Sequence, residues 1–276
     1  MTIFLGSIFF ILLLLIIWYS FRFEPYNFKV EKIRFYFKNL PLSFDRVTIV
    51  QISDLHSKQF GRREKLVLKM INQLNPDYIF ITGDIIDSHT KIEDLDLCRP
   101  FWEKLSQSYQ DRIFAIFGNH LHDSRILNVH DFKKTIESCN IPILLNENRK
   151  LIRNGEYIYL IGVDDPRTKH HNLKQALQGV EDKRVKILLA HSPEITEDLE
   201  EGEVDLILSG HTHGGQVRLP FIRNFWIPTR DHGKYVSGLY QVKSIPLYIN
   251  RGIGVDVIPI RFNCPPEITL IELRKG

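Results

Sequence analysis

The sequence contains little that would cross-link the chain or attract a polyanion. Three of its 276 residues are cysteine, and Cys98, Cys139 and Cys264 lie far apart. An odd number of widely spaced cysteines excludes a disulfide framework and shows no metal-binding spacing, so we expect buried thiols. The net charge is only +3, which lacks the signature of a nucleic-acid-binding protein, so no nucleic-acid partner is expected.

Internal repeats, low-complexity tracts and long Gly/Ser/Pro linkers are also missing from the sequence. A chain of 276 residues, 43% of them hydrophobic, can form one large catalytic domain with a substantial core. Nothing in the sequence sets an oligomeric state.

Charge is absent from the first part of the chain. Residues 2–21 carry no charged side chain and consist mainly of Ile, Leu and Phe. At about 1.5 Å per helical residue, about 20 residues span about 30 Å, the thickness of the hydrocarbon layer of a bilayer. Trp18 and Tyr19 stand at the end of this run, where interfacial aromatic residues are common. Residues 1–21 are therefore predicted to form a transmembrane anchor.

A cleaved signal peptide is the alternative interpretation of residues 1–21. It requires basic residues before the apolar run and small residues at a cleavage site after it. No Lys or Arg precedes the run, and residues 18–23 are bulky, so an uncleaved anchor is favoured. Several basic residues follow, and the positive-inside rule then predicts a single-pass protein with a cytoplasmic catalytic domain: Arg22, Lys29, Lys32, Arg34 and Lys38.

The rest of the chain has the pattern of an α/β domain. Residues 22–46 alternate between apolar and polar side chains and predict a juxtamembrane strand and lead-in, and residues 47–276 form the catalytic domain. Helices are predicted at residues 64–74, 92–105 and 131–139, with a break or bend at Pro100. Strands are predicted at residues 47–53, 78–82, 113–117, 157–163, 185–189 and 204–208, followed by short strands at 236–242, 246–250 and 267–273.

Five short polar segments directly follow apolar strands. The carboxyl ends of the strands in an α/β sheet converge along one edge, so these segments can meet there although they lie far apart in sequence. They supply carboxylates, an amide and imidazoles, the ligands that hard and borderline divalent metals prefer. Together they predict a two-metal hydrolase site that cuts phosphoester bonds: Asp54-Leu55-His56, Gly83–Asp87, Gly118-Asn119-His120, Ala190-His191 and Gly210–His213.

In their order, the five segments resemble the motifs of the calcineurin-like metallophosphoesterase superfamily. The resemblance implies a four-layer α/β/β/α sandwich behind one transmembrane helix. It also implies two divalent ions, Mn²⁺ first, with Fe, Zn²⁺ or Mg²⁺ as alternatives. Asp84 would bridge the two ions. The other implied ligands are Asp54, His56 and His213 for one ion, and Asn119, His191 and His211 for the other.

His120 follows the expected ligand Asn119 directly and would face the substrate. As an imidazolium it would protonate the leaving oxygen or stabilise the transition state. Members of the superfamily usually carry Asp or Glu next, and that acid supports the histidine, but here the next residue is Leu121. Asp123 is the candidate substitute and so a second candidate catalytic residue. Asp87 would either orient a ligand histidine or lie in a solvated loop.

The C-terminal third resembles a membrane-associated bacterial branch of the superfamily, through residues 210–220, 250–254 and 259–267. That branch includes phosphodiesterases and enzymes that split UDP-2,3-diacylglucosamine in lipid A synthesis. We therefore expect hydrolysis of a phosphodiester or pyrophosphate bond in a phosphorylated, lipid-linked substrate at the bilayer. Three arginines are candidates to bind the substrate phosphate, with structural ion pairs as the alternative: Arg218, Arg251 and Arg261.

Residues 218–230 interleave arginines with bulky apolar side chains. Such a segment suits a membrane interface, and packing into the protein core is the alternative. Two other functions also remain open, namely a general phosphodiesterase acting on small soluble substrates and a non-catalytic, membrane-tethered binding module. The intact ligand set argues against the module, and the near-neutral charge argues against a nuclease.

Overall fold

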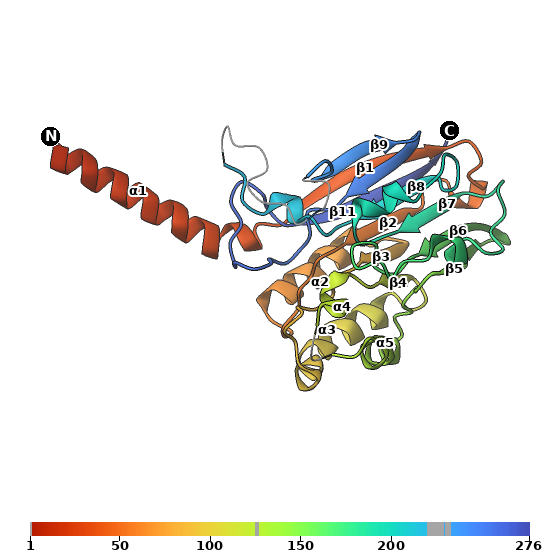
Figure 1. Ribbon diagram of the computed structural model, residues 1–276, viewed down its shortest axis with the longest axis horizontal. Coiled ribbons are helices and arrows are strands. Elements are labelled where there is room, and N and C mark those ends of the chain that lie inside the picture. Colours follow the sequence, from red (N-terminus) through yellow and green to blue (C-terminus); the bar gives the residue numbers. More distant parts are fainter. Residues whose placement is uncertain (1, 125–126, 220–228, 230–232) are drawn as a thin grey trace.

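The computed structural model describes residues 2–124, 127–219, 229 and 233–276. Two β-sheets form the centre of the molecule (Figure 1). Within the described residues the first sheet has the strand order β1-β11-β2-β3-β4, and the second has the order β5-β6-β7-β8-β10-β9. The expected α/β fold is therefore confirmed.

The first sheet is mixed. It contains β1 (Lys29–Phe37), β2 (Thr48–Ile52), β3 (Tyr78–Thr82), β4 (Ile113–Ile116) and β11 (Glu267–Lys275). The strands β2, β3 and β4 are parallel to one another, and β11 is parallel to β1 but antiparallel to β2. All five residues of β3 are buried, because both faces of this strand are covered, as its uninterrupted apolar sequence predicts.

The second sheet is parallel at its centre and antiparallel at its two edges. It contains β5 (Glu147–Arg153), β6 (Glu156–Gly162), β7 (Lys186–Leu189), β8 (Leu206–Ser209), β9 (Gly238–Val242) and β10 (Ile245–Ile249). The strands β6, β7, β8 and β10 run in one direction, and the edge strands β5 and β9 run in the other. The carboxyl ends of the central strands therefore lie together at one edge of the sheet.

In the part of the chain that the structure describes, three hydrophobic cores separate four layers. The helices α2 (Arg62–Leu74), α3 (Leu95–Ser108) and α5 (Val129–Ser138) pack on the outer face of the first sheet, seen below β3 and β4 in Figure 1. A second core fills the space between the two sheets. A third lies under α6 (Leu173–Ala176) and the 3-10 helix η4 (Pro193–Glu197), so the layer over the second sheet is thin.

Two local predictions differ from the structure. The helix expected at residues 92–105 begins at Leu95 and continues through Pro100 to Ser108. A proline inside a helix costs about 3 kcal/mol, but burying three large side chains regains about 1.5–3 kcal/mol each: Phe101, Trp102 and Leu105. The strand β5 was not predicted, because four of its seven residues are charged.

The first helix, α1 (Thr2–Arg22), projects away from the two sheets (Figure 1). The segment Phe4–Tyr26 has a mean hydropathy of 2.4 and is only 6% buried within the protein, so it is long and apolar enough to cross a membrane. Its lower end is joined to the folded part. The backbone N–H of Arg261 donates to the carbonyl oxygen of Ser20 at 3.0 Å, and the buried Glu24 carboxylate accepts from the backbone N–H groups of Asn263 and Cys264.

Candidate metal centre

The residues expected as metal ligands meet at the shared edge of the two sheets, and all of their side chains are buried. Each follows the carboxyl end of a parallel strand, as predicted. They come from five strands: Asp54 and His56 after β2, Asp84 after β3, Asn119 after β4, His191 after β7, and His211 and His213 after β8.

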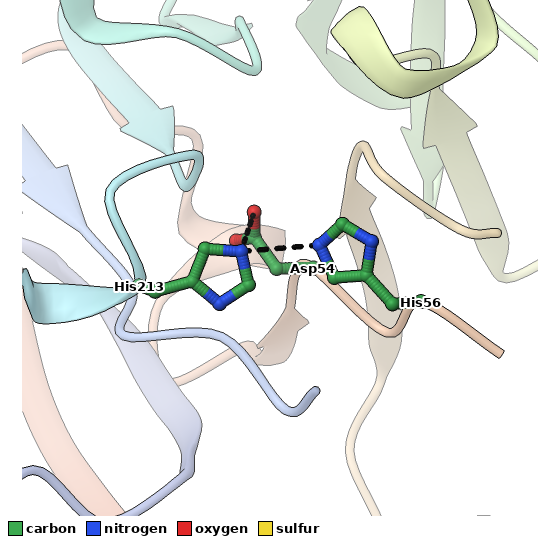
Figure 2. Close-up of side chains that lie close together, drawn as sticks. All are labelled: Asp54, His56 and His213. Atoms are coloured by element: carbon green, nitrogen blue, oxygen red, sulfur yellow. Dashed lines mark hydrogen bonds and ion pairs between the residues drawn. The ribbon is translucent and has the colours of Figure 1, made fainter. Parts of the chain in front are cut away.

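Asp54, His56 and His213 form the first cluster (Figure 2), with one ligand atom from each lying within 4.8 Å of the others. The Nε2 atoms of His56 and His213 are 3.1 Å apart, and His213 Nε2 lies 3.5 Å from Asp54 Oδ1. Two imidazole nitrogens that bind one ion at about 2.1 Å and at a right angle lie about 3 Å apart. The spacing therefore fits a shared divalent ion.

Asp84, His191 and His211 form the second cluster by the same criterion. His191 Nε2 lies 3.1 Å from Asp84 Oδ2. The same carboxylate oxygen is 3.8 Å from His56 Nε2 in the first cluster. Asp84 thus lies between the clusters, where a carboxylate can bridge two ions.

Hydrogen bonds orient two of the expected ligand side chains. His191 Nδ1 lies 2.8 Å from the carbonyl oxygen of Thr82, which can only accept, so Nδ1 carries a proton and Nε2 is the nitrogen that would bind a metal ion after losing its proton. The Asn119 amide donates through Nδ2 to Asp123 Oδ2 at 3.0 Å. Its Oδ1 is buried and has no hydrogen-bond partner among the described residues. Such an acceptor fits a cation.

The backbone at the centre is strained. Five expected ligands have positive φ angles: 48° for Asp54, 43° for His56, 44° for Asp84, 70° for His211 and 50° for His213. This left-handed conformation costs an L-residue roughly 1 kcal/mol or more and accumulates at functional sites. Neighbouring loops hold this conformation in place, because the backbone N–H of Asp54 donates to the carbonyl oxygen of Gly83 at 3.1 Å and the backbone N–H of His56 donates to the backbone carbonyl oxygen of Asp84 at 3.0 Å.

Burial and close charges shift the pKa values of the cluster. Burial raises the pKa of Asp54 to about 6 and lowers the pKa of His56 to about 4. Burial also opposes the charged form of His191, but the Asp84 carboxylate outweighs it and raises the His191 pKa to about 10. Burial opposes ionisation of Asp84 too, yet His191 and His120 hold its pKa well below the usual range. The carboxylates therefore require positive charge in the pocket, which cations or protonated imidazoles supply.

The His120 ring faces the centre and lies beside two carboxylates. Its Nε2 is 3.8 Å from Asp84 Oδ2 and 3.6 Å from Asp256 Oδ1, and its Nδ1 lies 3.2 Å from the Ser88 backbone nitrogen. Burial opposes protonation of His120, but the two carboxylates raise its pKa to about 9. The acid that supports His120 is therefore Asp256, which the sequence analysis missed. The feature of the sequence that could have pointed to Asp256 is the strand before it, β10, which is parallel to β8 and therefore ends at the same edge of the sheet.

The expected contact between Asp123 and His120 is not the one that the structure shows. The Asp123 carboxylate accepts from the Asn119 amide instead, because both residues lie on one turn of the short helix α4 (Asn119–His122) and its C-cap. Asp123 thus orients an expected metal ligand. Asp87 likewise contacts surface groups, with its carboxylate accepting from the His89 N–H and lying 3.5 Å from Lys58 Nζ.

The arginines expected to bind substrate phosphate contact the protein. Arg261 is fully buried, and its guanidinium donates to the carbonyl oxygens of Gly254 and Cys264, among others. Its role is therefore structural, which corrects the prediction. Arg251 pairs with two glutamates, Glu31 at 2.6 Å and Glu267 at 2.7 Å.

Arg218 donates to the carbonyl oxygen of Gly214 at 2.7 Å and to the Ser237 hydroxyl. Most of the candidate interface loop at residues 218–230 lies outside the described residues. The sequence analysis also missed Arg167, whose Nη1 lies 3.3 Å from His211 Nε2. Arg167 follows β6, the strand predicted at residues 157–163, so the strand end was its signal.

Two sheets with clustered carboxylates and imidazoles at their common edge define a metal-dependent phosphoesterase. The sequence pattern of the family "Calcineurin-like phosphoesterase" matches residues 47–215, and the chain belongs to this family. The family expected from the five motifs is thus confirmed. The expected class of enzyme, a metal-dependent hydrolase of phosphoesters, is confirmed with it.

Three curated relatives are similar over most of this chain. The metallophosphoesterase YkuE of Bacillus subtilis is 34% identical, and the match covers 85% of this chain and 82% of the relative. Phosphodiesterase YaeI of Escherichia coli is 29% identical, with 82% and 81% covered. A "Transmembrane protein with metallophosphoesterase domain" of Danio rerio is 30% identical, and the match covers 90% of this chain but 58% of that longer protein.

Proposed function

We propose that this phosphoesterase hydrolyses a phosphodiester or pyrophosphate bond of a lipid-linked substrate at the membrane, such as UDP-2,3-diacylglucosamine. One observation carries the proposal. The foot of the apolar helix α1 is hydrogen-bonded to residues 261–264, and the same C-terminal segment places Asp256 beside His120. A site joined to a membrane helix in this way lies within reach of lipid headgroups.

The buried side chains would share the work as follows. Asp84 would bridge two ions, and His120, with Nε2 facing the centre, would hold a proton for the leaving oxygen. When bound, a pair of divalent ions supplies a nucleophile at neutral pH and neutralises charge on the phosphoryl oxygens. Mixed nitrogen and oxygen ligands suit Mn²⁺, with Fe and Zn²⁺ as alternatives, and so many imidazoles disfavour Mg²⁺. The remaining ligands would be Asp54, His56 and His213 for one ion, and Asn119, His191 and His211 for the other.

We also propose that α1 anchors the protein in the inner membrane with the catalytic part in the cytoplasm. Large apolar side chains are exposed along the helix, for example Phe9 at 70%, and water would disfavour that exposure. The basic residues Arg22, Lys29 and Lys32 follow the helix, which supports a cytoplasmic side. The Danio rerio relative is named a transmembrane protein.

The second candidate function is a general phosphodiesterase for small soluble substrates, and the Escherichia coli relative is named a phosphodiesterase. A non-catalytic binding module is disfavoured, because the pocket retains a full set of buried ligands. Less than about one equivalent of metal after metal-replete purification would support that module instead.

The test uses the full chain, purified in detergent and loaded with Mn²⁺. Release of UMP from UDP-2,3-diacylglucosamine is followed beside hydrolysis of bis-p-nitrophenyl phosphate, with Asp84→Ala as the control. UMP release that disappears in Asp84→Ala would support the lipid-linked substrate. Cleavage of the small diester alone would overturn it in favour of the second candidate.

A further inference from the structure

A cavity of about 330 Å³ opens beside the metal centre, between the start of α2 and residues 255–259. Its lining includes His56, an expected metal ligand, and Tyr26, which ends the 3-10 helix η1 (Glu24–Tyr26) directly after α1. This cavity, the α2 groove, therefore joins the metal centre to the foot of the apolar helix.

The α2 groove is cationic. Lys58, Arg62 and Arg63 contribute to its lining. The one acid among the lining residues, Glu64, is only 4% exposed, and its carboxylate is engaged by Arg63 and by the Gly61 N–H. The Lys58 side chain is 73% exposed. Arg63 thus pairs with Glu64, and Lys58 Nζ lies 3.5 Å from the Asp87 carboxylate, which leaves Arg62 as the lining cation without an ion pair among the described residues. An anionic phosphate group in the groove would therefore meet the positive charge of Arg62 and of the exposed Lys58.

The groove is fixed in place relative to α1. Arg62 lies over the Tyr26 ring, with its guanidinium carbon 4.7 Å from the ring centre, so the start of α2 is held against the foot of the helix. The hydrogen bonds of Ser20 and Glu24 hold the segment on the other side of the groove. The mouth of the groove therefore stays at the level where α1 would leave a bilayer.

The surroundings of the mouth are apolar. Val257 and Ile258, between the lining residues Val255 and Pro259, are 78% and 52% exposed. Phe21, in the last turn of α1, and Phe23, directly after the helix, are 43% and 50% exposed. A cationic pocket with exposed apolar side chains around it suits a ligand that has a phosphate head and a hydrocarbon tail.

We propose that the α2 groove binds the anionic phosphate headgroup of a membrane lipid and delivers it from the bilayer to His56. The choice of a membrane lipid rests on the proposed function. The cavity has room for a headgroup but not for a diacyl lipid, so the acyl chains remain in the bilayer beside α1. Lys58 and Arg62 hold the phosphate, and Tyr26 positions Arg62.

The test measures binding of phosphatidylglycerol, an anionic phosphodiester lipid, to the full chain in a neutral detergent by native mass spectrometry. The groove variant is Lys58→Ala/Arg62→Ala. The matched control, Lys65→Ala/Lys69→Ala, removes two exposed cations from α2 that do not line the groove. Each cation that contacts the phosphate contributes about a factor of five, so we expect the groove variant to lose roughly 10-fold or more in affinity. The control should lose less than about 2-fold.

Equal losses in the two variants would overturn the proposal, because they would show general charge attraction instead of a site. Glycerophosphoglycerol, the same headgroup without acyl chains, is expected to bind at least about 10-fold more weakly than the lipid, and equal binding would overturn the membrane source. The binding assay needs no turnover. Absence of hydrolysis by the unaltered, Mn²⁺-loaded enzyme would therefore count against the proposed function alone.

Discussion

His191 donates its Nδ1–H to the carbonyl oxygen of Thr82 at 2.8 Å, and this single contact aims Nε2 at Asp84. We expect His191→Ala to lower metal content and to reduce phosphodiester hydrolysis by about 100-fold or more, because a ligand is lost along with its fixed orientation. Metal is measured by inductively coupled plasma mass spectrometry. The exposed His130 offers a control, since His130→Ala should leave both quantities unchanged.

Gly118 lies against Asp84, so that a Cβ at this position would overlap the Asp84 carboxylate. Its φ of −124° suits any residue, and Gly118→Ala therefore tests steric contact alone. We expect a loss of about 1–3 kcal/mol in the free energy of unfolding and a loss of activity through displacement of Asp84.

Gly179→Ala is the comparison for Gly118→Ala. Its φ of 77° is left-handed, but apart from its two neighbours in the chain no residue lies within 4 Å of its added Cβ. We expect a cost of about 1–2 kcal/mol in stability with full activity per folded molecule. Full activity of Gly118→Ala would contradict the assignment of close packing at Asp84.

Asp123 and Asp256 should separate in their effects. Asp123 orients Asn119, so Asp123→Ala is expected to weaken metal binding by about 10–100-fold. Asp256 lies beside His120, so Asp256→Ala should keep the metal and reduce turnover. Metal titration and turnover at saturating metal distinguish the two. Reduced turnover with unaltered metal affinity in Asp123→Ala would return Asp123 to the role first expected of it.

Asp77 ties the two sheets together. Its carboxylate accepts from the Thr48 N–H in β2 at 2.8 Å and from Arg153 in β5 at 2.9 Å. Burial opposes ionisation, but these hydrogen bonds outweigh it and lower the Asp77 pKa. The stabilisation is therefore present above the unfolded-state pKa and is lost as pH falls through the lower folded-state pKa.

We expect Asp77→Asn to cost about 1 kcal/mol at about pH 7 and progressively less as the pH falls below the unfolded-state value of 3.8, measured by urea unfolding in detergent. The exposed Asp182 provides the control through Asp182→Asn. A cost that does not change with pH would show that the charge of Asp77 is not involved.

The side of the membrane can be tested with one new thiol. Cys98, Cys139 and Cys264 are buried, and burial raises the pKa of Cys98 to about 12, so we expect little background labelling. Ile152 on β5 is 67% exposed. In Ile152→Cys, a membrane-impermeant maleimide should label the protein only after the cells are lysed. Labelling of intact cells would place the catalytic part outside.

The expected metal ligands could be predicted from the sequence because each of them follows a recognisable strand. Parallel strands that are covered on both faces have uninterrupted apolar sequences, as in Ile79–Ile81. The polar residue after such a sequence lies at the edge of the sheet. The edge strand β5 was not predicted, because it pairs with β6 through its backbone and needs no alternation of apolar side chains. Charged side chains such as Arg149 and Lys150 remain exposed there and show no strand pattern.

Contacts between irregular segments could not be predicted from the sequence. Asp256 is held by Gln216, whose side-chain oxygen accepts from the Asp256 N–H at 2.8 Å and whose amide donates to the Asp256 carbonyl oxygen at 3.0 Å. Neither segment has a periodicity that predicts this pairing. The prediction that Arg261 binds substrate phosphate was wrong for a related reason. Arginines are usually exposed, but the carbonyl groups that surround this one come from loops whose path only the fold defines.

The joint made by Ser20 and Glu24 has a kinetic consequence. Because the foot of α1 is bonded to the folded part at both residues, the catalytic centre cannot swing far from the plane in which the helix is held. If α1 lies in the membrane and the substrate is lipid-linked, as proposed, enzyme and substrate would meet by lateral diffusion in two dimensions. The rate would follow the mole fraction of the substrate in the bilayer instead of its bulk concentration, and inert lipid would slow the reaction by dilution within the surface.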